Sequence, residues 1–195
     1  MKHRVFIAIN LPEGVKTALS KYQNKWQKLP VKWTKSENLH ITLVFIGDVD
    51  EGKILKIKQA INKVIVRYKS FPIVFDKTLY SPHKKDKEIP KMIWVKGQLS
   101  KDFLNLKKDL EKELTRKIGF SSENRPACRQ SRETVLHITL ARIKEWEWRI
   151  IEPDERPEIE EDINFKITAE SIELMESVLK RSGSEYTILE SFPLD

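Results

Sequence analysis

The chain has 195 residues, of which 39% are hydrophobic and 33% are charged, a balance typical of a soluble globular protein and not of a disordered one. It contains no apolar run of membrane-spanning length, and its N-terminus lacks the pattern of a cleaved signal peptide. The single cysteine, Cys128, excludes an internal disulfide bond. We therefore expect a cytoplasmic protein without a membrane segment.

Charge is unevenly distributed along the chain. The formal net charge is +7, but residues 152–162 carry seven acids and one arginine, so the remainder carries +13. A basic surface attracts polyanions such as RNA at long range, although lysine-rich surfaces also serve solubility. Charge alone therefore does not distinguish a nucleic-acid-binding protein from one that is only highly soluble.

The apolar pattern of the first half predicts alternating strands and helices. In chain order, we expect a buried strand at 5–9, a helix that begins at Pro12 and ends before Pro30, a strand at 39–46, a helix at 54–68, and a strand or bent pair of strands at 71–80. A basic loop at 81–91 follows.

The second half repeats this order. It predicts a strand at 92–95, a helix that Ser100 caps and that ends near Gly119, a polar loop at 121–134 with Arg125, Arg129 and Arg132, and a strand that contains residues 137–140. The acidic segment 152–162 then stands where the first half has its second helix. Strands at 164–174 and 185–192 complete the chain.

This duplicated order of strand, helix, strand, connection and strand predicts an α+β fold. We expect one domain over residues 1–195, built of two pseudo-symmetric, interlocked lobes. Mostly antiparallel sheets would face a central cleft, with the helices on the outside.

The tetrapeptide His-Ile-Thr-Leu occurs once in each half, at 40–43 and at 137–140. Alternate residues of a strand point to the same face, so His40 and Thr42 project together, as do His137 and Thr139. One His-x-Thr in a strand is more often structural than functional. Two copies at equivalent positions of a duplicated fold predict one shared site.

Two histidines on opposing strands suit displacement at phosphorus. The entering and leaving oxygens lie on opposite sides of the phosphorus atom, so a base and an acid are needed on opposite sides. The ordinary pKa of histidine, about 6.5, allows one ring to be neutral and the other protonated. Thr42 and Thr139 can donate hydrogen bonds to the non-bridging oxygens, and Arg142 could add a bidentate contact.

The remaining candidates have weaker patterns. The sequence has no metal-ligand spacing and no P-loop, so we expect neither a metal nor a cofactor. His3 and His83 have no partner pattern, and Cys128 has no identifiable activating base. Four aromatic residues could stack on a nucleobase but are more often part of a core: Trp33, Trp146, Trp148 and Tyr186.

The doubled motif, which Arg142 closes in HITLAR, resembles the two-histidine (2H) phosphoesterase superfamily and, within it, the RNA 2′,3′-cyclic phosphodiesterases, historically called 2′-5′ RNA ligases. The similarity extends along the chain through RVFIAINLP, VKWTKSENLHITLVFIGDV, KMIWVKG and SVLKRSGSEYTILESFPL. The chain departs from the family pattern at Leu136, where proline commonly precedes the histidine, in the longer loop after Arg125, and at Val44, which is often basic.

The resemblance implies a bilobal fold, a metal-free site, and hydrolysis of a ribose 2′,3′-cyclic phosphate to the 2′-phosphate, with reversible 2′-5′ joining of RNA ends in some members. It makes His40 the proton donor to O3′ and His137 the proton acceptor that activates water. Thr42, Thr139 and Arg142 would bind the phosphate. We expect a monomer that acts on RNA ends or nucleotides with a 2′,3′-cyclic phosphate.

Two alternatives remain. A related 2H phosphoesterase that acts on another cyclic phosphate or on a 2′-5′ oligonucleotide would keep both motifs. A non-catalytic RNA-binding protein would use the basic surface alone. Its binding would survive the loss of both histidines and would weaken steeply with salt.

Overall fold

The computed structural model describes residues 2–26, 28–81, 89–121, 134–181 and 183–195. His83, Cys128 and the arginines of the polar loop, with almost all of that loop, lie outside these ranges.

The described chain contains the order strand, helix, strand, helix, strand twice, with one additional short strand, β2, in the first half. The first half consists of β1 (His3–Asn10), α1 (Glu13–Gln23), β2 (Val31–Trp33), β3 (His40–Val49), α2 (Glu51–Ile65) and β4 (Phe71–Ser81). The second half consists of β5 (Met92–Gly97), α3 (Lys101–Ile118), β6 (His137–Ile143), α4 (Glu145–Ile150) and β7 (Glu161–Ala169). The strands β8 (Ser171–Lys180) and β9 (Gly183–Pro193) close the chain.

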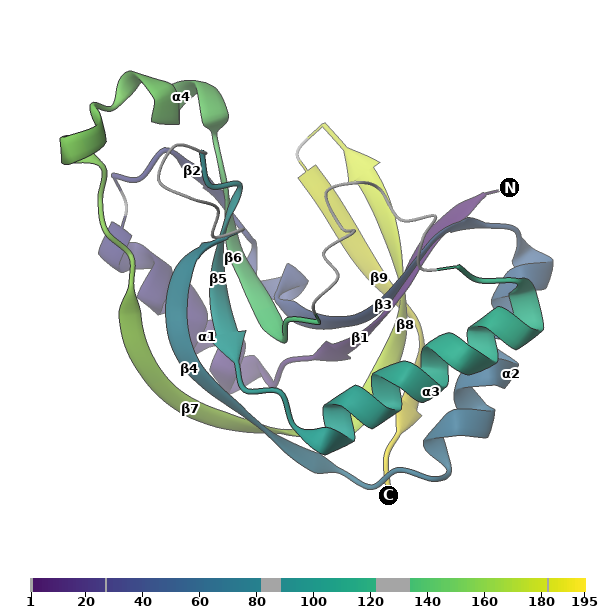
Figure 1. The fold of residues 1–195 in the computed structure, drawn as a ribbon. Helices are drawn as coiled ribbons and strands as arrows, with labels where there is room; N and C mark the ends of the chain where they lie inside the picture. Colours follow the sequence, from purple (N-terminus) through teal and green to yellow (C-terminus); the bar gives the residue numbers. More distant parts are fainter. Residues whose placement is uncertain (1, 27, 82–88, 122–133, 182) are drawn as a thin grey trace.

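The described strands form one nine-stranded sheet with the order β7-β4-β5-β6-β3-β1-β8-β9, to which β2 adds by pairing with β6. Each described strand pair is antiparallel. The sheet bends in the middle (Figure 1), where β3 and β6 share the residue pair Ile41–Ile138. The predicted α+β fold class is confirmed, with the refinement that the two lobes share one continuous sheet.

The helices α1 and α3 are exchanged between the two lobes. We call the part of the sheet formed by β1, β3, β8 and β9 the N-lobe, and the part formed by β2 and β4–β7 the C-lobe. The helix of the first half, α1, packs on the C-lobe, where Gln23 Nε2 donates to Leu140 O at 3.3 Å and the Tyr22 hydroxyl donates to Glu161. The helix of the second half, α3, packs beside α2 on the N-lobe (Figure 1).

The ends of α3 follow from local sequence chemistry. Ser100 Oγ accepts a hydrogen bond from Phe103 N at 3.1 Å, and the helix ends at Gly119, whose φ of +66° is the left-handed conformation that glycine adopts without strain. The helix buries a stripe at helical spacing against the N-lobe: Phe103, Leu106, Leu110 and Leu114. Both predicted ends of this helix are confirmed.

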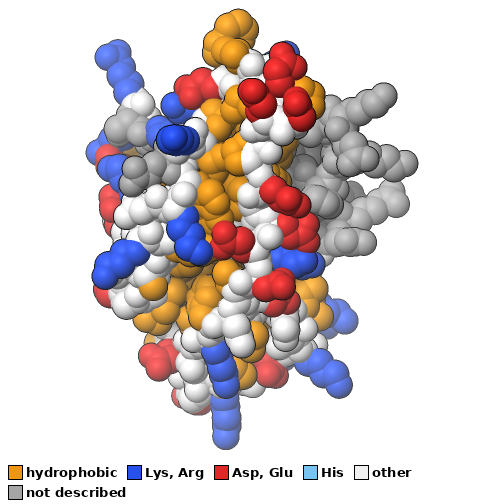
Figure 2. Space-filling view, turned by 90° about the vertical axis from the view of Figure 1, so that its left-hand side faces the viewer, with side chains coloured by type: hydrophobic (Ala, Val, Ile, Leu, Met, Phe, Trp, Pro, Cys, Tyr) orange, Lys and Arg blue, Asp and Glu red, His pale blue; other side chains and the backbone are white. Residues whose placement is uncertain are grey.

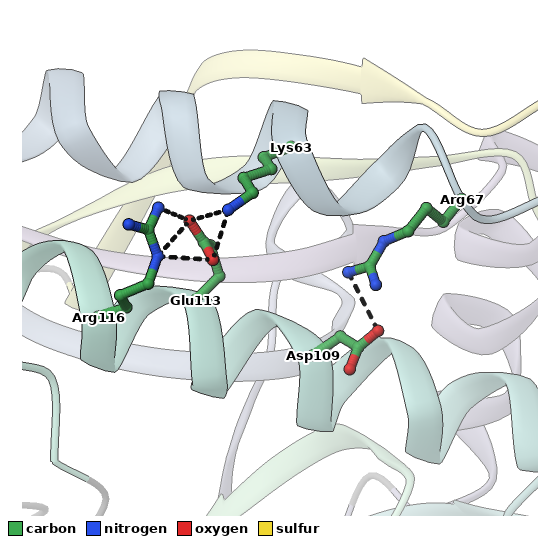
Figure 3. A network of polar contacts seen from close by, with 5 residues as sticks. All are labelled: Lys63, Arg67, Asp109, Glu113 and Arg116. Atoms are coloured by element: carbon green, nitrogen blue, oxygen red, sulfur yellow. Dashed lines mark hydrogen bonds and ion pairs between the residues drawn. The ribbon is translucent and has the colours of Figure 1, made fainter.

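A polar network joins α2 to α3 on the surface (Figure 3). The Glu113 carboxylate accepts hydrogen bonds from Arg116 Nε at 3.1 Å and from Lys63 Nζ at 3.3 Å. One turn along, an Arg67 terminal guanidinium nitrogen lies 3.1 Å from Asp109 Oδ2. These contacts connect the first half of the chain to the second across the N-lobe.

The second half differs from the sequence prediction in two places. Residues 164–174 are not one strand: β7 ends at Ala169 in the C-lobe and β8 begins at Ser171 in the N-lobe. The buried positions change phase between Ala169 and Ile172, which marks the turn. The helix α4 was not predicted, because it has only six residues and, of these, only Trp148 is buried.

The acidic segment 152–162 lies at the outer edge of the C-lobe. It leads into β7, the outermost strand of that lobe, and β4 and β5 separate β7 from β6. Figure 2 views this side and shows acidic side chains gathered along a band of hydrophobic ones. Within the described ranges, no helix has both the length and the apolar character needed to cross a bilayer.

Candidate active site

The two His-Ile-Thr-Leu segments lie on adjacent strands at the bend of the sheet. Ile41 pairs with Ile138 in antiparallel register, which sets His40 opposite Thr139 and Thr42 opposite His137. The two histidines are therefore diagonal neighbours, a relation in which residues lie roughly 7–8 Å apart and their Cβ atoms somewhat closer. The register therefore brings the two motif histidines together at the bend of the sheet.

The four polar side chains of the repeat share one face of the sheet, which we call the histidine face. His40, Thr42, His137 and Thr139 are all partly exposed. The apolar residues that alternate with them are buried on the other side: Ile41, Leu43, Ile138 and Leu140. The alternation expected from the sequence is therefore present in both strands.

Both imidazoles are held by the same kind of hydrogen bond. Nδ1 of His40 lies 2.8 Å from Asn38 O, and Nδ1 of His137 lies 3.0 Å from Val135 O. A carbonyl oxygen only accepts, so each Nδ1 carries a proton and donates it. Nε2 is then an acceptor in the neutral ring and a donor in the protonated ring, so each histidine can act as base or acid through Nε2.

A threonine of the motif contacts one of these nitrogen atoms directly. Thr42 Oγ1 lies 3.0 Å from His40 Nε2. The hydroxyl donates to Nε2 when the ring is neutral and accepts from it when the ring is protonated. This contact holds the His40 ring at two points, one on each nitrogen.

A β-bulge sets the direction of Arg142. In a regular strand, a residue five positions after His137 would point to the opposite face. The register of β6 against β5 shifts between Thr139 and Ala141, so that Leu140 is an extra residue in β6. Leu140 and Ala141 are both buried, and Arg142 returns to the histidine face, where it is exposed.

The carbonyl oxygen of the extra residue in β6 accepts two hydrogen bonds. Leu140 O accepts hydrogen bonds from Thr34 N at 2.8 Å and from Gln23 Nε2 at 3.3 Å. The first donor follows β2 and the second belongs to α1. Two neighbouring elements therefore stabilise the irregularity that presents Arg142.

The same irregularity occurs in the other lobe. The register of β3 against β1 shifts between Thr42 and Val44, so Leu43 is the extra residue there. Phe45 consequently takes the position in the N-lobe that Arg142 takes in the C-lobe. The duplication thus includes the bulge, although the residue that the bulge presents is different.

Comparisons with known proteins identify the family of the chain. The sequence model of a family described as "LigT like Phosphoesterase" matches residues 9–90. A protein of Methanothermobacter thermautotrophicus named RNA 2′,3′-cyclic phosphodiesterase is 31% identical, over all of both chains. The chain belongs to the LigT-like phosphoesterase family. Proteins with the same name from Methanocaldococcus jannaschii and Thermotoga maritima are 28% and 30% identical, over 97% and 95% of this chain and 99% and 92% of theirs.

Solved structures share the fold of this LigT-like phosphoesterase. The crystal structure of TT0787 from Thermus thermophilus superposes with a TM-score of 0.82 at 26% identity and covers 98% of this chain and 97% of that chain. E. coli LigT complexed with 3′-AMP superposes with a TM-score of 0.74 at 20% identity and covers 100% and 99% of the two chains. The second similarity concerns the fold alone.

Three aromatic side chains surround the histidines of this LigT-like phosphoesterase. The Trp94 ring stacks on His137 with a centroid separation of 3.8 Å, and Phe6 and Tyr186 contact His40 at 5.0 and 5.2 Å. Of the three, only Tyr186 was a sequence candidate. Trp94 and Phe6 were predicted as ordinary strand residues. Their proximity to the motif depends on strand pairing, which a single sequence does not specify.

The other sequence candidates lie elsewhere. Trp148 is buried in the C-lobe, Trp146 is 77% exposed on α4, and Trp33 packs against the main core from β2. His3 pairs with Glu176, with 2.7 Å between Nδ1 and Oε1. These residues are not part of the cluster around His40 and His137.

Leu136, a departure from the family pattern, is held against β5. Its side chain is buried, and its carbonyl oxygen accepts from Gly97 N at 2.9 Å. A Cβ atom at Gly97 would lie only 2.4 Å from Leu136 Cδ2. The residue before His137 is therefore fixed by packing and by a backbone hydrogen bond, and it needs a glycine opposite.

No group of three or more His, Cys, Asp or Glu side chains in the described ranges is placed to hold a metal ion. The assigned roles of the two histidines, two threonines and Arg142 stay predictions, as does the absence of a metal requirement.

Proposed function

We propose that the protein is an RNA 2′,3′-cyclic phosphodiesterase, which hydrolyses the ribose 2′,3′-cyclic phosphate at an RNA end to a 2′-phosphomonoester. The observation that carries this proposal is the pairing of β3 with β6, because it sets two His-Thr pairs on one face. The names of the relatives from Methanothermobacter, Methanocaldococcus and Thermotoga support it.

In the proposed reaction, Nε2 of neutral His137 takes a proton from water while the water oxygen bonds to phosphorus. The bond between phosphorus and O3′ breaks, and O3′ takes the proton from Nε2 of protonated His40. The products are a 2′-phosphomonoester and a 3′-hydroxyl group, and solvent restores both histidines. The choice of acid and base follows the family resemblance, since the two rings have the same Nδ1 hydrogen bond.

The remaining motif residues would bind the phosphate. Thr42 and Thr139 donate to the non-bridging oxygens, whose negative charge increases in the transition state. Arg142, which the bulge turns to the histidine face, adds a charge-assisted contact. Five side chains would thus act on one phosphorus atom without a cofactor.

The same site could join RNA ends. If the 5′-hydroxyl group of a second RNA replaces water, the same steps form a 2′-5′ phosphodiester, and the reaction is reversible. One chain supplies both histidines, so the proposed site needs no partner subunit. We propose a cytoplasmic monomer, and light scattering of the eluted peak in size-exclusion chromatography would measure its mass.

Alanine substitution of the histidines tests the proposal. We expect His40→Ala and His137→Ala each to lower kcat on a cyclic-phosphate-ended oligonucleotide by about 10²–10⁴-fold, the usual contribution of a general acid or base. Circular dichroism should remain unchanged, because both rings are partly exposed. His3→Ala, which removes a histidine outside the cluster, serves as the matched control. Full activity of either motif variant would contradict the mechanism.

A substrate panel and a chelator separate the remaining alternatives. Cyclic-phosphate-ended RNA, other cyclic phosphates and 2′-5′ oligoadenylate should be compared at equal concentration, and RNA ends should react fastest. EDTA should leave the rate unchanged. Faster cleavage of 2′-5′ oligoadenylate would favour the related-enzyme alternative, and inhibition by EDTA would contradict metal independence.

A further inference from the structure

The two halves of the histidine face differ in the residues that flank the histidines. In the N-lobe, Asn10 of β1 lies opposite His40. In the C-lobe, Lys96 of β5 lies opposite His137. Because β5 is the counterpart of β1 in the duplication, Lys96 occupies the position equivalent to Asn10. The residues that follow the two bulges also differ, because the N-lobe has uncharged Phe45 at the position where the C-lobe has Arg142.

The C-lobe half of this face is consequently cationic. Lys96 and Arg142 are exposed, and the structure gives neither an ion-pair partner among the described residues. Their own strands, β5 and β6, contain no aspartate or glutamate. Lys32 of β2 lies opposite Arg142 and adds a third positive charge to this face. We call Lys32, Lys96 and Arg142 the basic wall.

Among the described residues, no ion pair joins an acidic residue of the C-lobe to Lys96 or Arg142. Lys77 of β4 also lies opposite Lys96, but it pairs with Glu160 near the outer edge of the sheet. Glu161 and Asp162 lie in β7, which β4 and β5 separate from β6. Lys96 and Arg142 therefore add positive charge to the histidine face.

At the positions equivalent to Lys96 and Arg142, the N-lobe half has no cation. Asn10 is neutral, Phe45 is aromatic, and the nearby Arg4, whose guanidinium lies 5.2 Å from the Phe45 ring centroid, has Asp48 opposite in register. At these two equivalent positions of the histidine face, only the C-lobe is cationic. A substrate with a single phosphate needs no cations beyond Arg142, whereas a strand with further phosphates does.

An aromatic ring lies between the cations of the wall. Along β5, Trp94 lies between Lys96 and Met92, which is opposite Arg142. Alternation of cations with an aromatic side chain is the arrangement by which proteins bind single-stranded nucleic acid. The basic wall therefore fits the backbone of a single strand that ends at the histidines.

We propose that Lys96, supported by Lys32, binds the phosphodiester backbone of the RNA strand that leads to the terminal cyclic phosphate, and so makes oligonucleotides better substrates than cyclic mononucleotides. This inference rests on the proposed function, because it needs a cyclic phosphate between His40 and His137. It adds to that function the side from which the RNA strand approaches the histidines and a preference for oligonucleotides over mononucleotides.

The test compares uridine 2′,3′-cyclic phosphate with a short oligouridylate that ends in the same group. For the wild type, we expect a higher kcat/KM on the oligonucleotide and a steeper loss with salt, because each phosphate contact on a single strand adds about −0.7 to the logarithmic salt slope. In Lys96→Gln, the ratio of the two kcat/KM values should fall about fivefold and the slope for the oligonucleotide should decrease by about 0.7. Lys96→Arg, which retains the charge, should keep both.

Lys112→Gln on α3 is the matched control, because it removes an exposed lysine from the helical side of the N-lobe. It should have the wild-type ratio and salt slope. A Lys96→Gln variant with the wild-type ratio and slope would overturn the proposal, as would a wild type that does not distinguish the two substrates.

A binding measurement tests the role of Lys96 separately from the proposed phosphodiesterase activity. Fluorescence anisotropy of a labelled oligouridylate ending in a 2′-phosphate, the product of the proposed reaction, reports on the basic wall without turnover. Weaker binding to Lys96→Gln than to Lys112→Gln supports the proposal, and equal binding overturns it. Failure of the wild type to cleave either substrate would instead contradict the proposed function.

Discussion

In both candidate catalytic histidines, Nδ1 donates a hydrogen bond to a backbone carbonyl oxygen, which leaves Nε2 available for proton transfer. Asn38 O and Val135 O each lie two residues before a histidine and accept from its Nδ1 atom. The two-residue spacing is the same in both motifs, so the second copy repeats the orientation of the first. The sequence showed the repeat of His40 and His137, but it did not show their tautomers, because carbonyl positions depend on the local backbone.

We predict that both rings, when neutral, are the Nδ1–H tautomer. The hydrogen bond to a carbonyl is lost in the other tautomer, which would leave Nδ1 facing an acceptor without a proton. Long-range ¹H–¹⁵N NMR of His40 and His137 at alkaline pH measures this directly, and His3→Ala simplifies the assignment. The Nε2–H tautomer in either ring would contradict the account.

Gly97 is predicted to be essential for the packing before His137. Gly97→Ala should destabilise the protein by about 1–3 kcal/mol, the usual cost of overpacking, because its Cβ would come within 2.4 Å of Leu136 Cδ2 and 3.0 Å of Val74 O. Urea unfolding measures this free energy. Gly14→Ala is the matched control, since a Cβ there meets nothing within 4 Å. Equal stability of Gly97→Ala and the wild type would contradict the packing argument.

Among the elements, those with strong local signals were predictable. Ser100 and Gly119 marked the ends of α3 because capping depends on nearby residues only. The separation of β7 from β8 was missed, because their partners β4 and β1 are distant in sequence. The bulges in β3 and β6 were missed for the same reason: an extra residue is defined only against a partner strand.

The network between α2 and α3 should make stability depend on pH. Hydrogen bonds from Arg116, and then from Lys63, lower the pKa of Glu113 from its ordinary 4.5 to about 2. A carboxylate with a lowered pKa contributes stability that is present above its unfolded pKa and is lost as the pH falls through the folded one. This contribution should therefore disappear between about pH 4.5 and pH 2.

Glu113→Gln tests this dependence. The variant should have a lower Tm than the wild type at pH 7, and the difference should shrink as the pH falls through that window. Thermal unfolding followed by circular dichroism at several pH values gives the comparison. A difference in Tm that is independent of pH would show that the charge of Glu113 is not its cause.

At the scale of the whole molecule, the sequence revealed the duplication and much of the candidate site. The histidine and the threonine of His-Ile-Thr-Leu both recur, so the repeat indicated a shared functional site as well as a duplicated fold. The exchange of helices was not visible. Whether α1 covers its own lobe or the other depends on contacts such as that of Gln23 with Leu140, 117 residues apart. The aromatic surroundings of the histidines were hidden for the same reason.

The exchanged helices predict that the chain unfolds as one domain. All five tryptophans lie in the C-lobe or in the segment after α1 that packs on it: Trp26, Trp33, Trp94, Trp146 and Trp148. The longest described helices, α2 and α3 with 15 and 18 residues, lie on the N-lobe. Tryptophan fluorescence thus reports on the C-lobe, and circular dichroism at 222 nm reports mainly on the N-lobe.

Because each lobe is covered by a helix from the other half, the two probes should give the same urea midpoint. Coincident transitions are expected over the whole unfolding curve. Two separate midpoints would mean that the lobes unfold independently, in contradiction to the single domain.

The most direct test of the proposed reaction is the position of the phosphate in the product. We predict that ³¹P NMR of a ribonucleoside 2′,3′-cyclic phosphate incubated with the wild-type protein shows only the 2′-phosphomonoester, and that His40→Ala and His137→Ala leave the cyclic phosphate intact. A 3′-phosphomonoester would mean that the bond to O2′ breaks instead. An unreacted substrate with the wild type would contradict the assignment of the two histidines to this chemistry.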